Sequence, residues 1–136
     1  MDQAFLDRIR RKVESGDRLS MRELDVLREA ARSQPGPTLR LAVAHAMINA
    51  EENRSALTLL ERLVGDFPRD LQSWLGLASA LLALDRFVEA ERALNAALAL
   101  SPRDPEALKA LALLAMRRGE HSRAREWIAD VLRRDP

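Results

Sequence analysis

Residues 71–104 read LQSWLGLASALLALDRFVEAERALNAALALSPRD, and this stretch decides the fold. Small and large apolar residues recur in it at helical spacing, on both sides of a polar break at Asp85 and Arg86. Pro102 follows the second apolar segment, and a proline cannot continue a helix. The stretch therefore predicts two antiparallel helices that are joined by a short turn and closed by a proline.

The same pattern recurs before and after this stretch with a period of 34 residues, marked by Pro68, Pro102 and Pro136. Alanines coincide at two further positions of the period and large apolar residues at three: Ala44, Ala78 and Ala112; Ala56, Ala90 and Ala124; Val43, Leu77 and Leu111; Leu60, Leu94 and Ile128; Val64, Leu98 and Leu132. Small residues let two helices approach closely where they cross, and the large residues fill the space beside them. A fixed period of this length predicts stacked helical hairpins.

These positions make the chain resemble the tetratricopeptide repeat (TPR) family. Residues 71–104 carry the family signature at Trp74, Leu77, Ala78, Leu81, Phe87, Ala90, Leu94, Ala97 and Pro102. Residues 105–136 carry it at Leu108, Leu111, Ala112, Gly119, Ala124, Ile128, Val131 and Pro136. Residues 37–70 keep Val43, Ala44, Met47, Ala56, Leu60, Leu63 and Pro68, but place Arg40 where the family prefers Trp or Leu. The resemblance implies an all-α solenoid of three hairpins, 37–70, 71–104 and 105–136, within one continuous domain.

Residues 1–36 lack the signature but still predict two helices. An apolar stripe from Phe5 to Val13 indicates the first, and residues 15–17 interrupt it. Ser20 and Glu23 form a capping-box pattern that begins the second helix, which we expect to end near Arg32. We interpret this pair as a divergent cap on the N-terminal end of the stack. A helix folded into the protein's own groove, or a dimerisation arm, remains an alternative.

Helix boundaries in the repeats follow from local signals. Asp104 before Pro105 predicts an N-cap with proline at the first helical position, and Gly36 before Pro37 is a weaker version of this signal. The turns inside the hairpins are expected near residues 51–53, 85–86 and 119–120.

Composition excludes several classes of protein. The 136 residues contain no cysteine, and 22 basic residues nearly balance 21 acidic ones. Disulfides and thiolate chemistry are therefore excluded, and no net field attracts nucleic acid. No apolar run approaches a membrane span, and the N-terminus lacks the features of a signal peptide. We expect a cytoplasmic chain, and its preference for Arg over Lys together with abundant Ala suggests a bacterial genome.

Catalytic and metal-binding patterns are missing from the sequence. His45 and His121 lie at unlike positions of different repeats, without a second ligand at metal spacing. There is no glycine-rich phosphate loop and no nucleophile elbow. Basic runs alternate with acidic residues and lack aromatic residues for base stacking. We therefore expect no enzyme activity, no cofactor, no metal and no nucleic-acid partner.

The resemblance implies that a partner binds on the first helix of each hairpin, which lines the concave side of such a stack. The family's ligand-contacting positions correspond here to Leu41, His45, Ile48 and Asn49; Leu75, Ser79, Leu82 and Ala83; and Lys109, Leu113, Met116 and Arg117. We call this set the concave groove. It is largely apolar with a basic edge, which suits an amphipathic helix or an extended apolar peptide. Alternatively, these leucines are ordinary core.

One family subtype is excluded by the residues at its binding positions. Co-chaperone repeats that clamp a C-terminal carboxylate use Lys, Asn and Arg, whereas this chain has Leu41, His45, Gly76, Glu106 and Ala110 there.

The sequence also predicts a partly apolar face on the last helix. Trp127, Ile128 and Leu132 cannot all point at the preceding helix. This face is either tolerated in water, used for self-association, or covered by further repeats of a longer array. The leading hypothesis is a non-catalytic adaptor that binds an apolar peptide or helix in the concave groove, similar in outline to small bacterial secretion chaperones. The alternative is a self-assembling scaffold that stacks through this last face.

Overall fold

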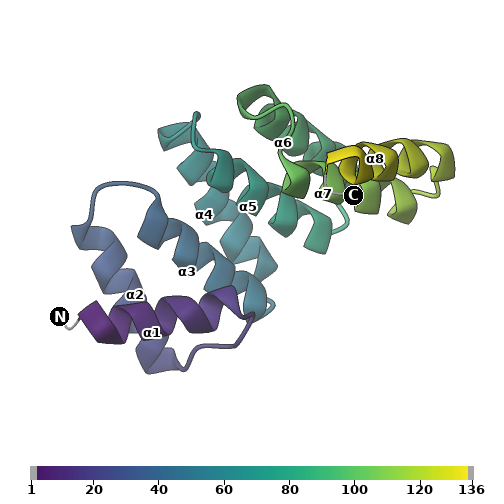
Figure 1. Cartoon of the computed structure of the whole chain (residues 1–136). Coiled ribbons are helices and arrows are strands. Elements are labelled where there is room, and N and C mark those ends of the chain that lie inside the picture. Colours follow the sequence, from purple (N-terminus) through teal and green to yellow (C-terminus); the bar gives the residue numbers. More distant parts are fainter. Residues whose placement is uncertain (1–2, 135–136) are drawn as a thin grey trace.

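A computed structural model describes residues 3–134 and shows an all-helical chain within that range (Figure 1). Its eight helices are α1 (Gln3–Glu14), α2 (Met21–Ser33), α3 (Thr38–Asn49), α4 (Asn53–Asp66), α5 (Leu71–Ala83), α6 (Phe87–Leu100), α7 (Pro105–Arg117) and α8 (His121–Arg134). The helices follow one another along an elongated stack whose two ends carry the N- and C-terminal helices. The predicted α-solenoid of three hairpins behind a divergent N-terminal pair is confirmed. Pro136, the predicted closing residue of the third repeat, lies outside the described residues.

Three hairpins, α3–α4, α5–α6 and α7–α8, make up the repeat region, and α4–α5 and α6–α7 contacts join them. The alanines of the 34-residue period are all buried: Ala44, Ala56, Ala78, Ala90, Ala112 and Ala124. Helices also approach closely at Gly76, where an added Cβ atom would lie 2.9 Å from Leu41 Cδ1 of α3 and 3.1 Å from Leu60 Cδ2 of α4. The small residues therefore set how closely consecutive helices pack.

The predicted helix caps are confirmed where a polar side chain is available. The Ser20 hydroxyl accepts from the backbone N–H of Glu23 at 3.1 Å, and the Glu23 carboxylate accepts from the Ser20 N–H at 2.9 Å. The Asp104 carboxylate accepts from the N–H of Ala107 at 2.9 Å. The weaker signal, Gly36 before Pro37, gives α3 no side-chain cap. Pro37 occupies the N-cap position there, and its side chain cannot accept a hydrogen bond.

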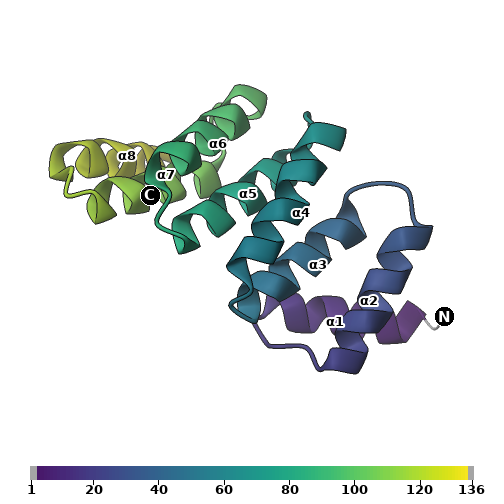
Figure 2. The ribbon, with the colours of Figure 1, turned by 180° about the vertical axis from the view of Figure 1, so that it is seen from behind.

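The N-terminal pair differs from a repeat hairpin. In both views α1 crosses α2 instead of running alongside it, and α2 packs against α3 (Figures 1 and 2). Within residues 3–134, α1 contacts only α2 and α3, so it does not occupy the groove side of α5 or α7. Asn49 fixes this arrangement, because its Nδ2 donates to the carbonyl oxygen of Val13 at 3.1 Å.

None of the helices between residues 3 and 134 has both the length and the apolar character that crossing a bilayer requires.

The turns inside the three hairpins share an unusual backbone conformation. Glu51, Asp85 and Gly119 lie 34 residues apart and have φ angles of 62°, 56° and 74°. This left-handed region disfavours every residue with a Cβ atom, and only the third repeat meets it with glycine.

We therefore expect Glu51→Gly to stabilise the protein by about 0.5–1 kcal/mol, because relief of the left-handed strain exceeds the added entropy of the unfolded chain. Gly119→Ala should destabilise it by about 1 kcal/mol. Urea unfolding followed by circular dichroism measures both changes. Glu52→Gly is the matched control, since Glu52 has a φ of −88°. An equal gain in stability for Glu52→Gly would show that the gain in Glu51→Gly does not come from relief of the positive φ angle.

Candidate protein-binding groove and a neighbouring cavity

The first-repeat residues of the concave groove are already engaged with the rest of the protein. Leu41 is half-buried against Gly76 of α5, and Ile48 is half-buried against the core. Asn49 is held by the N-terminal segment through its bond to Val13. These side chains therefore leave little free apolar surface for a ligand in the first repeat.

His45 is the histidine of the groove. Burial of its imidazole lowers the pKa of His45 from the ordinary value of 6.5, and the nearby carboxylate of Glu106 opposes this shift. Glu106 lies in the first turn of α7, so the charge acts across the groove from the third repeat to the first. The lowered pKa favours an uncharged His45 at neutral pH.

The second repeat requires a correction. The sequence places Leu75 and Leu82 on the groove surface, but the structure buries both in the core at 8% exposure. The reason is that α5 packs against α3, α4, α6 and α7, which together surround most of the helix. Of the remaining pair, Ala83 is exposed, and exposed Ser79 donates its hydroxyl to the Leu75 carbonyl oxygen at 3.1 Å.

The third repeat carries the free apolar surface of the groove. Leu113 and Met116 on α7 are 45% and 54% exposed, and Ile128 and Leu132 on α8 are 41% and 57% exposed. These four residues, together with Lys109, Ala112 and Val131, line an open cleft of about 240 Å³, which we call the end cleft. The structure therefore joins two surfaces that the sequence treats separately, the groove and the face of the last helix.

Of the two basic residues predicted at the edge of the groove, Arg117 already interacts with other residues of the protein. Arg117 donates to the carbonyl oxygen of Leu82 at 3.0 Å and lies 3.8 Å from the Asp85 carboxylate. It thereby satisfies a backbone acceptor at the C-terminal end of α5. Lys109 instead stands exposed at the end cleft.

Trp127 requires a second correction. The sequence places it with Ile128 and Leu132 on one uncovered face, but its ring is half-buried against the core. It lines a separate narrow space with Leu111, Leu114 and Ala115 of α7. Because consecutive helical residues point about 100° apart, Ile128 can face outward while Trp127 faces inward.

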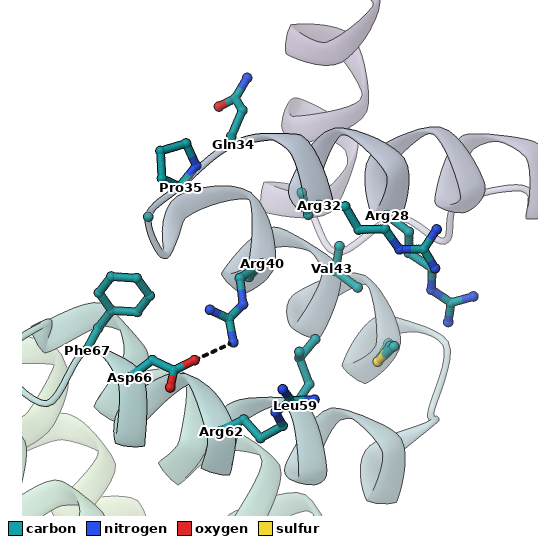
Figure 3. Close-up of a pocket in the computed structure, with 13 residues that line it drawn as sticks. Arg28, Arg32, Gln34, Pro35, Arg40, Val43, Leu59, Arg62, Asp66 and Phe67 are labelled. Carbon is teal, nitrogen blue, oxygen red and sulfur yellow. Dashed lines mark hydrogen bonds and ion pairs between the residues drawn. The ribbon is translucent and has the colours of Figure 1, made fainter.

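A larger cavity of about 680 Å³ lies between α2, α3 and α4, and we call it the α2–α4 cavity (Figure 3). Its lining combines apolar and basic side chains: Arg28, Ala31, Arg32, Gln34, Pro35, Gly36, Arg40, Val43, Met47, Leu59, Arg62, Asp66 and Phe67. Arg40 bonds to Asp66 at 3.0 Å, and its guanidinium lies 5.8 Å from the centre of the Phe67 ring. The sequence analysis did not predict this cavity, although Arg40 at a signature position was a signal for it.

Among residues 3–134, no group of three His, Asp or Glu side chains is placed to hold a metal ion.

The fold defines the class of the protein, an α-helical repeat scaffold. Two models of the tetratricopeptide repeat match residues 41–105 and 81–136, and together they span more than half of the chain. The chain belongs to the tetratricopeptide repeat family. No curated protein matches it.

Solved structures of similar fold support this assignment. A crystal structure of MamA has a TM-score of 0.77 and 20% identity, covering 100% of this chain and 76% of that one. The structure of residues 41 to the end of MamA from Desulfovibrio magneticus RS-1 has a TM-score of 0.73 and 19% sequence identity, and the match covers 82% of this chain and 64% of that one. YrrB, described as a TPR protein with an unusual peptide-binding site, has a TM-score of 0.74 and 17% sequence identity. The match covers 84% of this chain and 59% of that one. The chain thus spans less than two thirds of the latter two structures, and at these identities the likeness shows the fold alone.

The lowered pKa of His45 predicts a pH dependence of stability. Because the unfolded chain binds a proton more readily at this site, stability is fully present above the unfolded value of about 6.5 and falls as the pH drops below it. Between about pH 7.5 and about pH 5.5, wild type should lose more stability than His45→Gln in urea titrations. The same substitution at the exposed His121, His121→Gln, is the comparison variant. Equal slopes in wild type and His45→Gln would contradict the assignment.

Proposed function

We propose that this protein is a non-catalytic adaptor that binds an apolar peptide or amphipathic helix of another protein. The binding surface is the third-repeat end of the concave groove, continuing into the end cleft. The observation that carries the proposal is the exposure of Leu113 and Met116 side by side with Ile128 and Leu132 around one cleft. Contiguous exposed apolar side chains typically mark an interaction site.

The dimensions and edges of the end cleft support a helical or extended ligand. A volume of about 240 Å³ accommodates one or two apolar side chains, which a helix supplies from consecutive turns. The Lys109 ammonium stands beside the apolar lining and is available to a carboxylate on the polar side of the ligand. Met116 adds a flexible thioether that adapts to different side-chain shapes.

Family membership supports the general role, a protein-interaction scaffold, and YrrB is a TPR protein with a peptide-binding site. A second candidate function is self-assembly through the same surface, which the exposure of Ile128 and Leu132 favours. In that case a second copy of the chain covers the end cleft.

The remaining sequence predictions are kept as part of this proposal. Residues 1–36 form a cap, and residues 37–70, 71–104 and 105–136 form the repeats. A cytoplasmic location, a bacterial source and a chaperone-like role stay predictions from the sequence.

Leu113→Asp and Met116→Asp should each weaken binding of a fluorescein-labelled helical peptide with leucines at i, i+3, i+4 and i+7 and glutamines between. Loss of the apolar side chain and desolvation of the new carboxylate cost more than about 1.4 kcal/mol, so we expect at least about a tenfold loss of affinity by fluorescence anisotropy. Circular dichroism should remain that of wild type, because both positions are exposed.

Val88→Asp is the matched control, since Val88 is also exposed but lies on α6 outside the end cleft. An equal loss of affinity in Val88→Asp, or no binding by wild type, would argue against the end cleft as the site.

A further inference from the structure

The α2–α4 cavity has counterparts in the other two repeats. Shifted by one period, Arg40, Val43, Met47 and Leu59 become Trp74, Leu77, Leu81 and Ala93, which line a smaller pocket of about 340 Å³. Shifted by two periods, Val43, Met47 and Leu59 become Leu111, Ala115 and Trp127, around a space of only about 10 Å³. The three spaces are therefore one structural position that occurs once in each repeat.

A tryptophan reduces this space in the second and third repeats. The Trp74 indole lies half-buried there and donates its Nε1–H to the carbonyl oxygen of Pro68 at 2.8 Å. In the third repeat, the half-buried Trp127 of α8 lines the narrow space and packs against the core. In the first repeat the two equivalent positions are Arg40 and Leu59, so neither supplies an indole.

Arg40 lies at one side of this space instead of filling it. Its guanidinium pairs with Asp66 and stacks near Phe67 at one side of the cavity (Figure 3). The loop of residues 34–37 arches between α2 and α3 (Figure 2), and Gln34, Pro35 and Gly36 line the cavity at that end. The result is a volume of about 680 Å³, within the range of about 300–1,000 Å³ that is typical of binding pockets.

Apolar and charged side chains are separated within the cavity. Buried Ala31, Val43 and Met47 supply an apolar lining. Four arginines from three helices stand around it: Arg28 and Arg32 on α2, Arg40 on α3 and Arg62 on α4. Arg40 pairs with Asp66, and Arg32 pairs with Glu29 on the surface. Within the described part of the chain, Arg28 and Arg62 form no ion pair, so the cavity is left with unneutralised positive charge.

We propose that the α2–α4 cavity is a second protein-binding site, which takes an aromatic side chain of a partner flanked by acidic residues. The aromatic ring occupies the space that Trp74 and Trp127 reduce in the other repeats. The flanking carboxylates pair with Arg28 and Arg62, whose planar guanidinium groups bind carboxylates in a bidentate manner. A peptide suits the cavity better than a long acyl chain, because the side of exposed Gln34 and Pro35 is open to water.

This site is independent of the concave groove. Leu41 and His45 lie on one side of α3, whereas Val43 and Met47 point roughly the opposite way, because successive residues of a helix turn by about 100°. A ligand in the α2–α4 cavity therefore contacts α2 and α4 and leaves the end cleft free. The two proposals can fail separately.

The methionines of the chain allow a direct test by NMR of the intact protein with ¹³C-labelled methionine methyl groups. Met47 lines the α2–α4 cavity, Met116 lines the end cleft, and Met21 is exposed away from both. The probe is an acetylated peptide with one tryptophan between pairs of glutamates. We expect it to shift the Met47 methyl resonance and leave those of Met116 and Met21 in place. The affinity should fall as salt is added, because the arginine contacts are screened.

Two kinds of variant distinguish the contribution of the arginine charges from that of the cavity volume. Arg28→Glu and Arg62→Glu should each weaken binding at least about tenfold, while Arg92→Glu at the smaller pocket beside Trp74 should not. Arg40→Trp should narrow the cavity, as Trp74 narrows the second-repeat pocket, and weaken binding at least about tenfold without loss of folding, since it restores the residue type of the second repeat. Leu59→Trp tests the same space from α4, as Trp127 does from α8.

Several results would overturn the proposal. These are a Met47 resonance that does not respond to the peptide, affinity that survives both Arg40→Trp and Leu59→Trp, or equal binding of a peptide with glycine in place of tryptophan. A Met47 shift caused by laurate but not by the peptide would assign the cavity to an anionic lipid and would overturn the peptide assignment.

Discussion

Close contact between consecutive helices at small residues is the constraint on which this structure depends. The six periodic alanines are buried, and the absence of a side chain at Gly76 lets α5 approach Leu60 on the preceding helix α4 and Leu41 on α3. A larger side chain at these positions would push neighbouring helices apart, since protein interiors are close-packed. Repetition of this contact every 34 residues turns a local hairpin into a solenoid with the first helices on one side.

One candidate binding surface lies on the α7–α8 hairpin, and the other lies where Arg40 departs from the repeat pattern. At one end, α8 packs on α7 and leaves the end cleft open, so Leu113 and Met116 remain exposed next to Ile128 and Leu132. At the other end, Arg40 replaces the signature aromatic and the α2–α4 cavity results. The middle repeat satisfies the pattern, and its groove leucines Leu75 and Leu82 are buried. The regular part of the sequence thus supports the fold, and its departures create sites.

The 34-residue period, together with signals that act within a few residues, was sufficient to predict the architecture. Ser20 with Glu23 and Asp104 with Pro105 start helices through local hydrogen bonds, and the periodic alanines identify the crossings. Burial of Leu82 and inward packing of Trp127 could not be predicted in this way, because they depend on how several helices surround one another. The α2–α4 cavity was missed for a similar reason. Its volume depends on the angle between α2 and α3, which the sequence of the connecting loop does not specify.

The adaptor proposal requires that the end cleft serve another protein and not a second copy of this chain. Light scattering of the unmutated chain over a wide concentration range tests this requirement most directly. The account predicts a constant mass near the 15.3 kDa of one chain. A mass that rises with concentration in wild type, and returns to that of one chain in Leu132→Glu, would contradict it. That result would show that self-assembly covers the end cleft.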